Sequence, residues 1–264
     1  MVLSRPATML QAKPYQWPHD SSFGPSTTAL IIVDMQKDFL CPGGYLDSQG
    51  LSVEPTRAVI PQVQRLLAAF RTSGFPIYHT REGHRPDLST LSSRELLRSR
   101  NNPSGRGIGD EGPLGRHLVR GEQGHDIIPE LAPLPSEPVI DKPGRSAFQH
   151  TDLKLLLDNR RVRNLVICGV TTDVCVTSTM RDGSKFLSTR LCPPSTSGRA
   201  NIKEQMTWDL IACWSRTPQL LGIRSCMTQL CKASAKKVAF LALCQRQTMS
   251  LLPWKPGQNE FDVP

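Results

Sequence analysis

Asn164-Leu-Val-Ile-Cys-Gly-Val-Thr-Thr-Asp-Val-Cys175 joins a short apolar run to a glycine, two threonines and a cysteine. The apolar part has the length and composition of a strand buried on both faces. The residues that follow, 176–181, are compatible with a helix. Cys175 would then lie where a strand turns into a helix, and a helix N-terminus favours thiolate over thiol. Because a thiolate is a nucleophile, this stretch indicates the centre of an enzyme.

The residues before this stretch alternate between strand-like and helix-like patterns. Residues 81–126 are rich in Gly, Arg and Ser, and we predict a long loop there, a feature that usually carries function. The alternation predicts a three-layer α/β/α fold, with a Rossmann-like parallel sheet and helices on both faces. The predicted strands are 29–34, 76–80, 137–141 and 164–170, and the predicted helices are 55–72 and 152–160.

The charge of the chain is unevenly spread. The 264 residues are enough for one domain with a full core, and their net charge is +9. Residues 1–182 hold 21 Lys and Arg against 19 Asp and Glu, whereas residues 183–264 hold 11 against 4. The basic last third lacks the interleaved aromatic residues or recognition motif of a nucleic-acid-binding protein. We therefore expect no nucleic-acid partner.

Nothing in the sequence predicts export or membrane insertion. Residues 1–10 are too poor in apolar side chains for a signal peptide, and no apolar run is long enough to cross a bilayer. We expect a cytoplasmic protein with reduced thiols and no membrane partner. The eight cysteines lack the paired spacing of zinc ligands, so we predict no zinc site.

Three of the predicted strands end beside a reactive side chain. The first ends in Asp34, the third leads into Lys142, and the fourth leads to Cys175. Because ligands of open parallel sheets bind beyond the carboxyl ends of the strands, the three side chains should meet in one cleft. Cys175 would attack a carbonyl, Lys142 would lower the pKa of the thiol, and Asp34 would move the proton. The backbone N–H groups of Thr171 and Cys175 would hold the oxyanion.

Each of these residues also has a plainer interpretation, which the sequence leaves open. Cys175 fits a small buried hydrophobic residue, and Asp34 fits a helix N-cap. Lys142 precedes Pro143 and Gly144 and fits an exposed charge on a loop. The coincidence of all three at strand ends favours the catalytic interpretation, amide hydrolysis through a thioester intermediate.

Several stretches together form a family pattern. The strongest are VDMQKDF at 33–39, DKPG at 141–144 and GVTTDVC at 169–175. Further matching stretches are 15–18, 43–47, 79–87, 107–110, 118–122 and 126–130. On these motifs, residues 13–182 resemble the isochorismatase-like cysteine hydrolases, and most of all their biuret hydrolase and ureidoacrylate amidohydrolase branch.

The resemblance carries expectations for fold and site. It implies an isochorismatase-like hydrolase fold with a six-stranded parallel sheet and an Asp34–Lys142–Cys175 triad. It also implies a cis peptide bond between Val170 and Thr171. Inside the matching motifs, the predicted substrate contacts are Gln36, Phe39, Arg81 and Thr172.

The resemblance also implies a reaction. Members of this branch hydrolyse a carbamoyl or ureido C–N bond of a small molecule, need no cofactor and commonly form homo-oligomers. Nicotinamidases of the superfamily bind a metal through an Asp-x-His pattern after the second strand. This chain has Arg81-Glu-Gly-His84 there, so no metal is implied. Isochorismatases proper lack the catalytic cysteine, so Cys175 argues against vinyl-ether hydrolysis.

The resemblance stops after Asp182, and residues 183–264 form a basic, Cys-rich tail. We interpret residues from about 204 onward as an out-of-frame translation of the family's missing C-terminal part. A one-base shift there permits the family's Glu-Asp strand end and, later, Gly-Gly-Ile-Phe-Gly where the family has a Gly-Gly-Val-Phe-Gly turn. Residues 183–203 would be intron-derived. We expect this tail to be poorly ordered and the last strands of the 13–182 domain to be missing.

Two functions from different classes follow. The first is a cysteine-dependent amidohydrolase for a biuret- or ureidoacrylate-like substrate. The second is a catalytically inactive truncated isoform that acts, if at all, as a binding module.

Overall fold

The structure is a computed structural model that describes residues 17–18, 22–188 and 210–211. Its centre is a parallel sheet with the strand order β5-β2-β1-β6-β7. The strands are β1 Thr28–Val33, β2 Ile77–Glu82, β5 Val139–Lys142, β6 Asn164–Gly169 and β7 Leu210–Ile211. A separate antiparallel pair consists of β3 Glu111–Gly112 and β4 Gly115–Arg116. The predicted parallel α/β sheet is confirmed.

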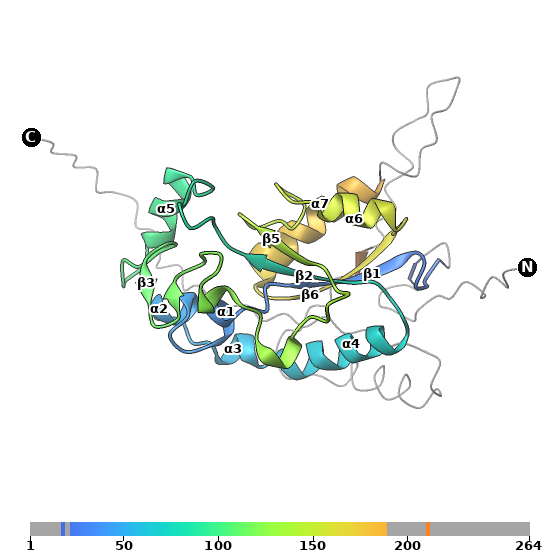
Figure 1. Cartoon of the computed structure of the whole chain (residues 1–264), viewed down its shortest axis with the longest axis horizontal. Helices are drawn as coiled ribbons and strands as arrows, with labels where there is room; N and C mark the ends of the chain where they lie inside the picture. The colour runs from blue at the N-terminus through green and yellow to red at the C-terminus, as the bar shows by residue number, and fades with distance from the viewer. Residues whose placement is uncertain (1–16, 19–21, 189–209, 212–264) are drawn as a thin grey trace, which may run out of the picture.

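Helices cover both faces of this sheet (Figure 1). On one side lies α4 Ile60–Thr72, and on the other lie α6 Leu153–Asn159 and α7 Thr177–Ser188. The short helices α1 Lys37–Leu40 and α2 Tyr45–Ser48 and the helix α5 Ser93–Arg100 gather near one end of the sheet. The remaining helical segments are α3 Glu54–Arg57, η1 Gln123–His125, η2 Pro129–Leu131 and the π-helical turn η3 Thr172–Val176.

The sequence of β1 explains why the sheet needs two helical layers. All six of its residues are buried. Because side chains alternate across a strand, Leu30 and Ile32 join the core that contains α4, while Ile31 and Val33 join the core under α6 and α7. Burying an aliphatic side chain of this size stabilises the fold by about 1.5–3 kcal/mol.

Two predicted elements differ from the structure. The helix predicted over 55–72 is two helices, because Pro61 has no N–H to continue a helix and lies instead in the first turn of α4. The loop predicted over 81–126 begins too early. Strand β2 continues through Arg81 and Glu82, and α5 forms inside the loop with Ser92 Oγ accepting the Glu95 N–H at 3.2 Å.

The expectations for the tail are only partly within the described residues. Helix α7 continues to Ser188, beyond the predicted domain end at Asp182. Strand β7 pairs in parallel with Leu165 and Val166 of β6. The absence of the family's last strands from the 13–182 domain stays a prediction. The sixth strand, the out-of-frame interpretation and the order of residues 189–209 and 212–264 lie outside the described residues. Among the described residues, no helix is long and apolar enough to cross a lipid bilayer.

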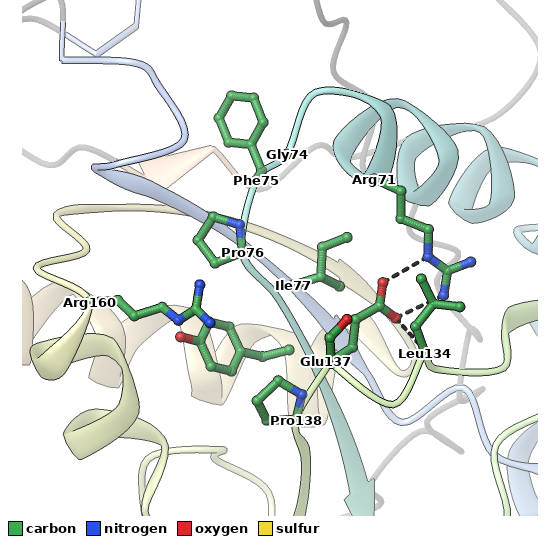
Figure 2. A pocket seen from close by; sticks show the side chains of 11 residues that line it. Arg71, Gly74, Phe75, Pro76, Ile77, Leu134, Glu137, Pro138 and Arg160 are labelled. Carbon is green, nitrogen blue, oxygen red and sulfur yellow. Dashed lines mark hydrogen bonds and ion pairs between the residues drawn. The ribbon is translucent and has the colours of Figure 1, made fainter. Parts of the chain in front are cut away.

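A pocket of about 280 Å³ lies at the amino ends of β2 and β5. It is therefore at the other edge of the sheet from Asp34 and Lys142. Arg71 of α4 holds both carboxylate oxygens of Glu137 there, with Nε–Oε1 at 2.7 Å and Nη2–Oε2 at 2.8 Å (Figure 2). Burial opposes ionisation of Glu137, but Arg71 and the Leu134 N–H outweigh it and lower the pKa of the carboxyl to about 2. The Arg71–Glu137 ion pair therefore links α4 to the segment that precedes β5.

Gly169 ends β6 at a point where the backbones of β6 and β1 lie close together. A Cβ at this position would lie 2.0 Å from Val33 O and 2.7 Å from Val33 N, and its φ is +120°. Gly169→Ala is therefore expected to lower the free energy of unfolding by at least about 3 kcal/mol, since backbone cannot yield as a side chain does. Urea unfolding would measure the loss.

Gly24→Ala is the matched control for this substitution. Gly24 has no atom within 4 Å of an added Cβ, and its φ is not in the left-handed region. Its substitution should change stability by less than about 1 kcal/mol. Equal losses for the two variants would contradict the proposed clash between β6 and β1.

Candidate active site

Asp34 is the first residue after β1 and has a left-handed backbone with φ of +52°. Aspartate tolerates this conformation better than most residues. The side chain is fully buried: Thr80 Oγ1 donates to Oδ1 at 2.6 Å, and Lys142 Nζ lies 2.8 Å from Oδ2. Burial raises the pKa of Asp34, although the charge of Lys142 opposes this.

Lys142 ends β5 and is fully buried. Its ammonium contacts Asp34 at 2.8 Å and Glu82 Oε2 at 3.1 Å, and donates to Gly144 O at 2.8 Å. Burial works against the charge, but the two carboxylates outweigh it and raise the pKa of Lys142. The exposed loop charge left open by the sequence is therefore excluded, because Lys142 is a buried ammonium between two carboxylates.

Cys175 lies in η3, the turn between β6 and α7, and is 3 % exposed. Its Sγ–H donates to Glu82 Oε2 at 2.9 Å, and Lys142 Nζ lies 3.5 Å from Sγ. Burial and the charge of Glu82 raise the pKa of the thiol well above its usual range, and Lys142 offsets this only in part. Lys142 therefore lowers the pKa of the thiol, as expected from the sequence, but burial and Glu82 raise this pKa more strongly.

The turn between β6 and η3 has the backbone that the resemblance implied. The peptide bond between Val170 and Thr171 is cis. Thr171 precedes η3, and its carbonyl accepts the N–H groups of Val174 and Val176 at 3.3 and 3.1 Å. Cys175 lies in the turn that follows the carboxyl end of β6. That the N–H groups of Thr171 and Cys175 form an oxyanion hole stays a prediction.

Glu82 was not among the residues predicted for the site, yet it contacts two of them. It ends β2 and pairs in register with Lys142 of β5. Because strand side chains alternate, Glu82 lies on the same face as Thr80, the partner of Asp34. The sequence could have indicated this residue. If the second predicted strand is extended by two residues, Glu82 lies at its carboxyl end, just as Asp34 lies at the carboxyl end of the first.

Three of the predicted substrate contacts have other partners. Gln36 is fully buried and holds the backbone of Glu82, accepting its N–H at 2.7 Å and donating to its carbonyl at 2.9 Å. Phe39 is buried edge-on against Tyr45, with ring centroids 6.3 Å apart. Arg81 alternates to the face away from Glu82 and forms two bonds with Asp141, at 2.7 and 3.0 Å.

Thr172, the remaining predicted substrate contact, lies in the same short turn as Cys175. It is partly exposed and is the first residue of η3. The side chains of Gln36, Phe39 and Arg81 contact the Glu82 backbone, the core and Asp141, and their contact with substrate stays a prediction.

The same cluster contains a group of three potential metal ligands. One ligand atom each from Asp34, Glu82 and Cys175 lies within 4.8 Å of the others. The ammonium of Lys142 stands 2.8 to 3.5 Å from all three groups, so this chain supplies the positive charge from its own side chain. The donor set does not fit a metal as long as that ammonium is charged, because two cations in one buried site repel each other.

Comparison with known proteins agrees with this architecture. The isochorismatase domain matches residues 28–185. A cysteine hydrolase from Pseudomonas syringae pv. phaseolicola 1448A is 31 % identical, with 61 % of this chain and 67 % of that chain covered and a TM-score of 0.50. An isochorismatase family protein from Desulfovibrio vulgaris subsp. vulgaris str. Hildenborough is 31 % identical, with 59 % and 73 % covered and a TM-score of 0.47.

A pyrazinamidase/nicotinamidase from Streptococcus mutans UA159 is 26 % identical, with 60 % of this chain and 80 % of that chain covered and a TM-score of 0.47. Since the domain match spans more than half of the sequence, this chain belongs to the isochorismatase family. It is a hydrolase of that family, with a cysteine at the carboxyl end of its central sheet.

Proposed function

We propose that this chain is a cysteine-dependent amidohydrolase that cleaves a carbamoyl or ureido C–N bond of a small molecule through a thioester intermediate. The observation that carries the proposal is the contact of one thiol with an ammonium and a carboxylate in a buried cluster. Sγ of Cys175 lies 3.5 Å from Lys142 Nζ and 2.9 Å from Glu82 Oε2. These are the parts that covalent acyl transfer needs: a nucleophile, a proton acceptor and a charge that stabilises the thiolate.

Each residue then has a role in the proposed reaction. Cys175 attacks the carbonyl carbon, and the thiolate that develops is stabilised by the ammonium of Lys142. Asp34, which lies 2.8 Å from the ammonium of Lys142, takes the thiol proton, passes it to the leaving amine and later activates water. The Thr171 and Cys175 N–H groups would receive the oxyanion of the tetrahedral intermediate. Catalytic roles for Asp34, Lys142 and Cys175 are the core of the proposal.

The substrate class rests on the sequence motifs. Membership of the isochorismatase family and the similar cysteine hydrolase support hydrolysis by a cysteine. The stretches at 33–39 and 79–87, which resemble biuret hydrolases and ureidoacrylate amidohydrolases, favour a planar carbamoyl or ureido group over other amides.

The test is an ammonia-release screen with biuret, ureidoacrylate and N-carbamoyl amino acids. A second protein, with the C-terminal part in the shifted frame, is assayed beside this chain. We expect release from at least one of the three, faster in the frame-corrected protein. A folded chain that releases no ammonia from any of them, in either form, would instead support the noncatalytic binding module.

A further inference from the structure

The pocket at the amino ends of β2 and β5 is formed because these two strands begin to pair late. Their first register pair is His79 with Val139, two residues after β2 has begun. The segment before β5 does not continue along β2 but turns on itself, with the Glu137 N–H donating to Leu134 O at 2.9 Å. The space left between the two segments is the pocket of about 280 Å³, and none of its lining residues has a role in the proposed reaction.

The backbone of Ile77 borders this space with a donor and an acceptor. Alternate residues of β2 bond toward β5, and the His79 N–H donates to Pro138 O at 3.0 Å. In the same ladder the Ile77 C=O would accept from residue 138, but proline has no N–H. No described residue accepts the Ile77 N–H. Because Ile77 is only 5 % exposed, this N–H and C=O are buried groups of the kind that normally have partners.

Tyr78 adds a second donor without a partner. Its side chain is 1 % exposed, and its hydroxyl has no hydrogen-bond partner among the described residues. Tyr78 and Arg160 both line the pocket. Burial raises the pKa of the phenol, and the positive charge of Arg160 opposes this, so the two side chains lie close enough to interact. A buried hydroxyl without a partner beside a cavity indicates a place for a ligand atom.

The charges that line the pocket leave one cation uncompensated. Arg71 and Glu137 neutralise each other through two hydrogen bonds. Arg160 follows α6, is exposed, and forms no ion pair with any residue that the structure describes. Figure 2 shows Arg160 on one side of the pocket, the Arg71–Glu137 pair on the other and Ile77 between them. The pocket therefore favours a ligand with a negative group beside Arg160.

The remaining walls are apolar. Phe75, Pro76, Leu134 and Pro138 line the pocket, and the two prolines are partly exposed. An inorganic anion would leave these walls in contact with water, whereas an organic anion with an apolar group would cover them. The wall composition thus favours an organic acid over a phosphate or sulfate ion.

We propose that this pocket binds a small N-acyl amino acid with an apolar side chain. The amide N–H of the ligand donates to the Ile77 C=O, and one carboxylate oxygen accepts the Ile77 N–H. These are the two bonds that a hydrogen-bonded residue pair exchanges in an antiparallel ladder. The other carboxylate oxygen accepts from Arg160 and Tyr78, and the apolar side chain lies against Pro76 and Pro138. The site goes beyond the proposed function and takes no part in the hydrolysis.

The test is isothermal titration calorimetry of the full chain with N-acetyl-leucine, and with N-acetyl-leucinamide as the neutral analogue. We expect saturable binding to one site, at least about tenfold weaker for the amide, because a charge-assisted bond to Arg160 is lost. Arg160→Met should weaken binding of N-acetyl-leucine by at least about tenfold. Tyr78→Phe removes only the hydroxyl and should weaken it by about three- to tenfold.

Two control variants locate the binding site. Arg161→Met removes the neighbouring exposed arginine, which does not line the pocket, and should leave the affinity unchanged. Cys175→Ala alters the carboxyl end of the sheet and should also leave it unchanged. Since the measurement is binding, a chain that hydrolyses no amide still tests this proposal.

Three results would overturn the proposal. The first is the absence of saturable binding up to about 10 mM N-acetyl-leucine. The second is equal affinity for the acid and its amide, which would exclude the contact with Arg160. The third is binding that Arg160→Met and Tyr78→Phe leave within about twofold, or that Cys175→Ala abolishes, because the ligand would then lie elsewhere.

Discussion

Lys142→Met is expected to abolish amide hydrolysis and to lower the free energy of unfolding by about 3–5 kcal/mol. Methionine fills much of the same space but brings no charge. The carboxylates of Asp34 and Glu82 would then face each other in a buried site without the ammonium that both contact, at 2.8 and 3.1 Å. Breaking a buried ion pair from one side costs more than the pair contributes, because the remaining charge is stranded.

Alkylation of Cys175 gives a second measurement on the same variant. The charge of Lys142 lowers the pKa of this thiol, whereas burial and the carboxylates of Glu82 and Asp34 raise it. Without Lys142 the thiol pKa should rise further, so alkylation at pH 7–9 should be slower than in the unaltered chain. Denaturant unfolding at pH 7 and timed iodoacetamide labelling measure the two effects.

Lys154→Met is the matched control. Lys154 pairs with Asp158 one helical turn away at 2.7 Å, but its side chain is 40 % exposed. Such a pair contributes only about 0.3–0.5 kcal/mol, so neither stability nor labelling should change noticeably. If Lys154→Met lowered the free energy of unfolding as much as Lys142→Met, the argument that Lys142→Met leaves two buried carboxylates without a partner would be contradicted.

The positions of Asp34, Lys142 and Cys175 could be predicted because each follows a recognisable strand. A short apolar run marks a buried strand, and parallel strands share one carboxyl end. Asp34 follows β1, Lys142 ends β5 and Cys175 lies in η3, and both Asp34 and Cys175 lie within hydrogen-bond distance of Lys142 Nζ. This inference needed only the direction of the strands and no detail of side-chain packing.

Glu82 was not predicted as a site residue because the last residues of β2 are polar rather than apolar. Its last residues, Thr80, Arg81 and Glu82, are polar, so a pattern based on hydrophobicity ends the strand too early. They stay in the sheet because β5 pairs with them, Arg81 with Asp141 and Glu82 with Lys142. Pairing between segments about sixty residues apart cannot be read from local sequence.

Helix α5 shows a signal that was present and was not used. Ser92 and Glu95 form the Ser-x-x-Glu pattern that starts a helix, inside a segment predicted as loop on its composition. In the structure Glu95 also lies 3.6 Å from Arg145, three residues beyond Lys142. Helix α5 therefore contacts the segment that follows β5, a relation that only the fold reveals.

The state of the thiol is the clearest case of a property set by burial. From the sequence, Lys142 and a helix N-terminus argued for a thiolate. The structure adds a desolvated site and a second carboxylate, and these outweigh one cation at 3.5 Å. In the proposed reaction the thiolate of Cys175 would therefore form as the thiol attacks the carbonyl.

Cys175→Ala is expected to lower kcat by on the order of 10⁴-fold or more, because it removes the atom that forms the intermediate. Acid-quenched turnover of the unaltered chain should leave a substrate-derived acyl group on the Cys175 peptide, detected by mass spectrometry. The alanine variant should carry none. The small change in volume should leave folding nearly intact, so a loss of activity reports on chemistry.

Cys168→Ala is the matched control, since this second buried thiol lies in the same strand-to-turn stretch. Burial alone raises the pKa of Cys168 to about 12, and the side chain belongs to the core under α4, with no carboxylate or ammonium beside it among the described contacts. Its variant should keep kcat within a few fold and keep the acyl group on Cys175. Because both thiols are buried, a different outcome for the two would trace catalysis to the charged partners of Cys175. An acyl group on Cys168, or turnover by Cys175→Ala, would place the nucleophile elsewhere.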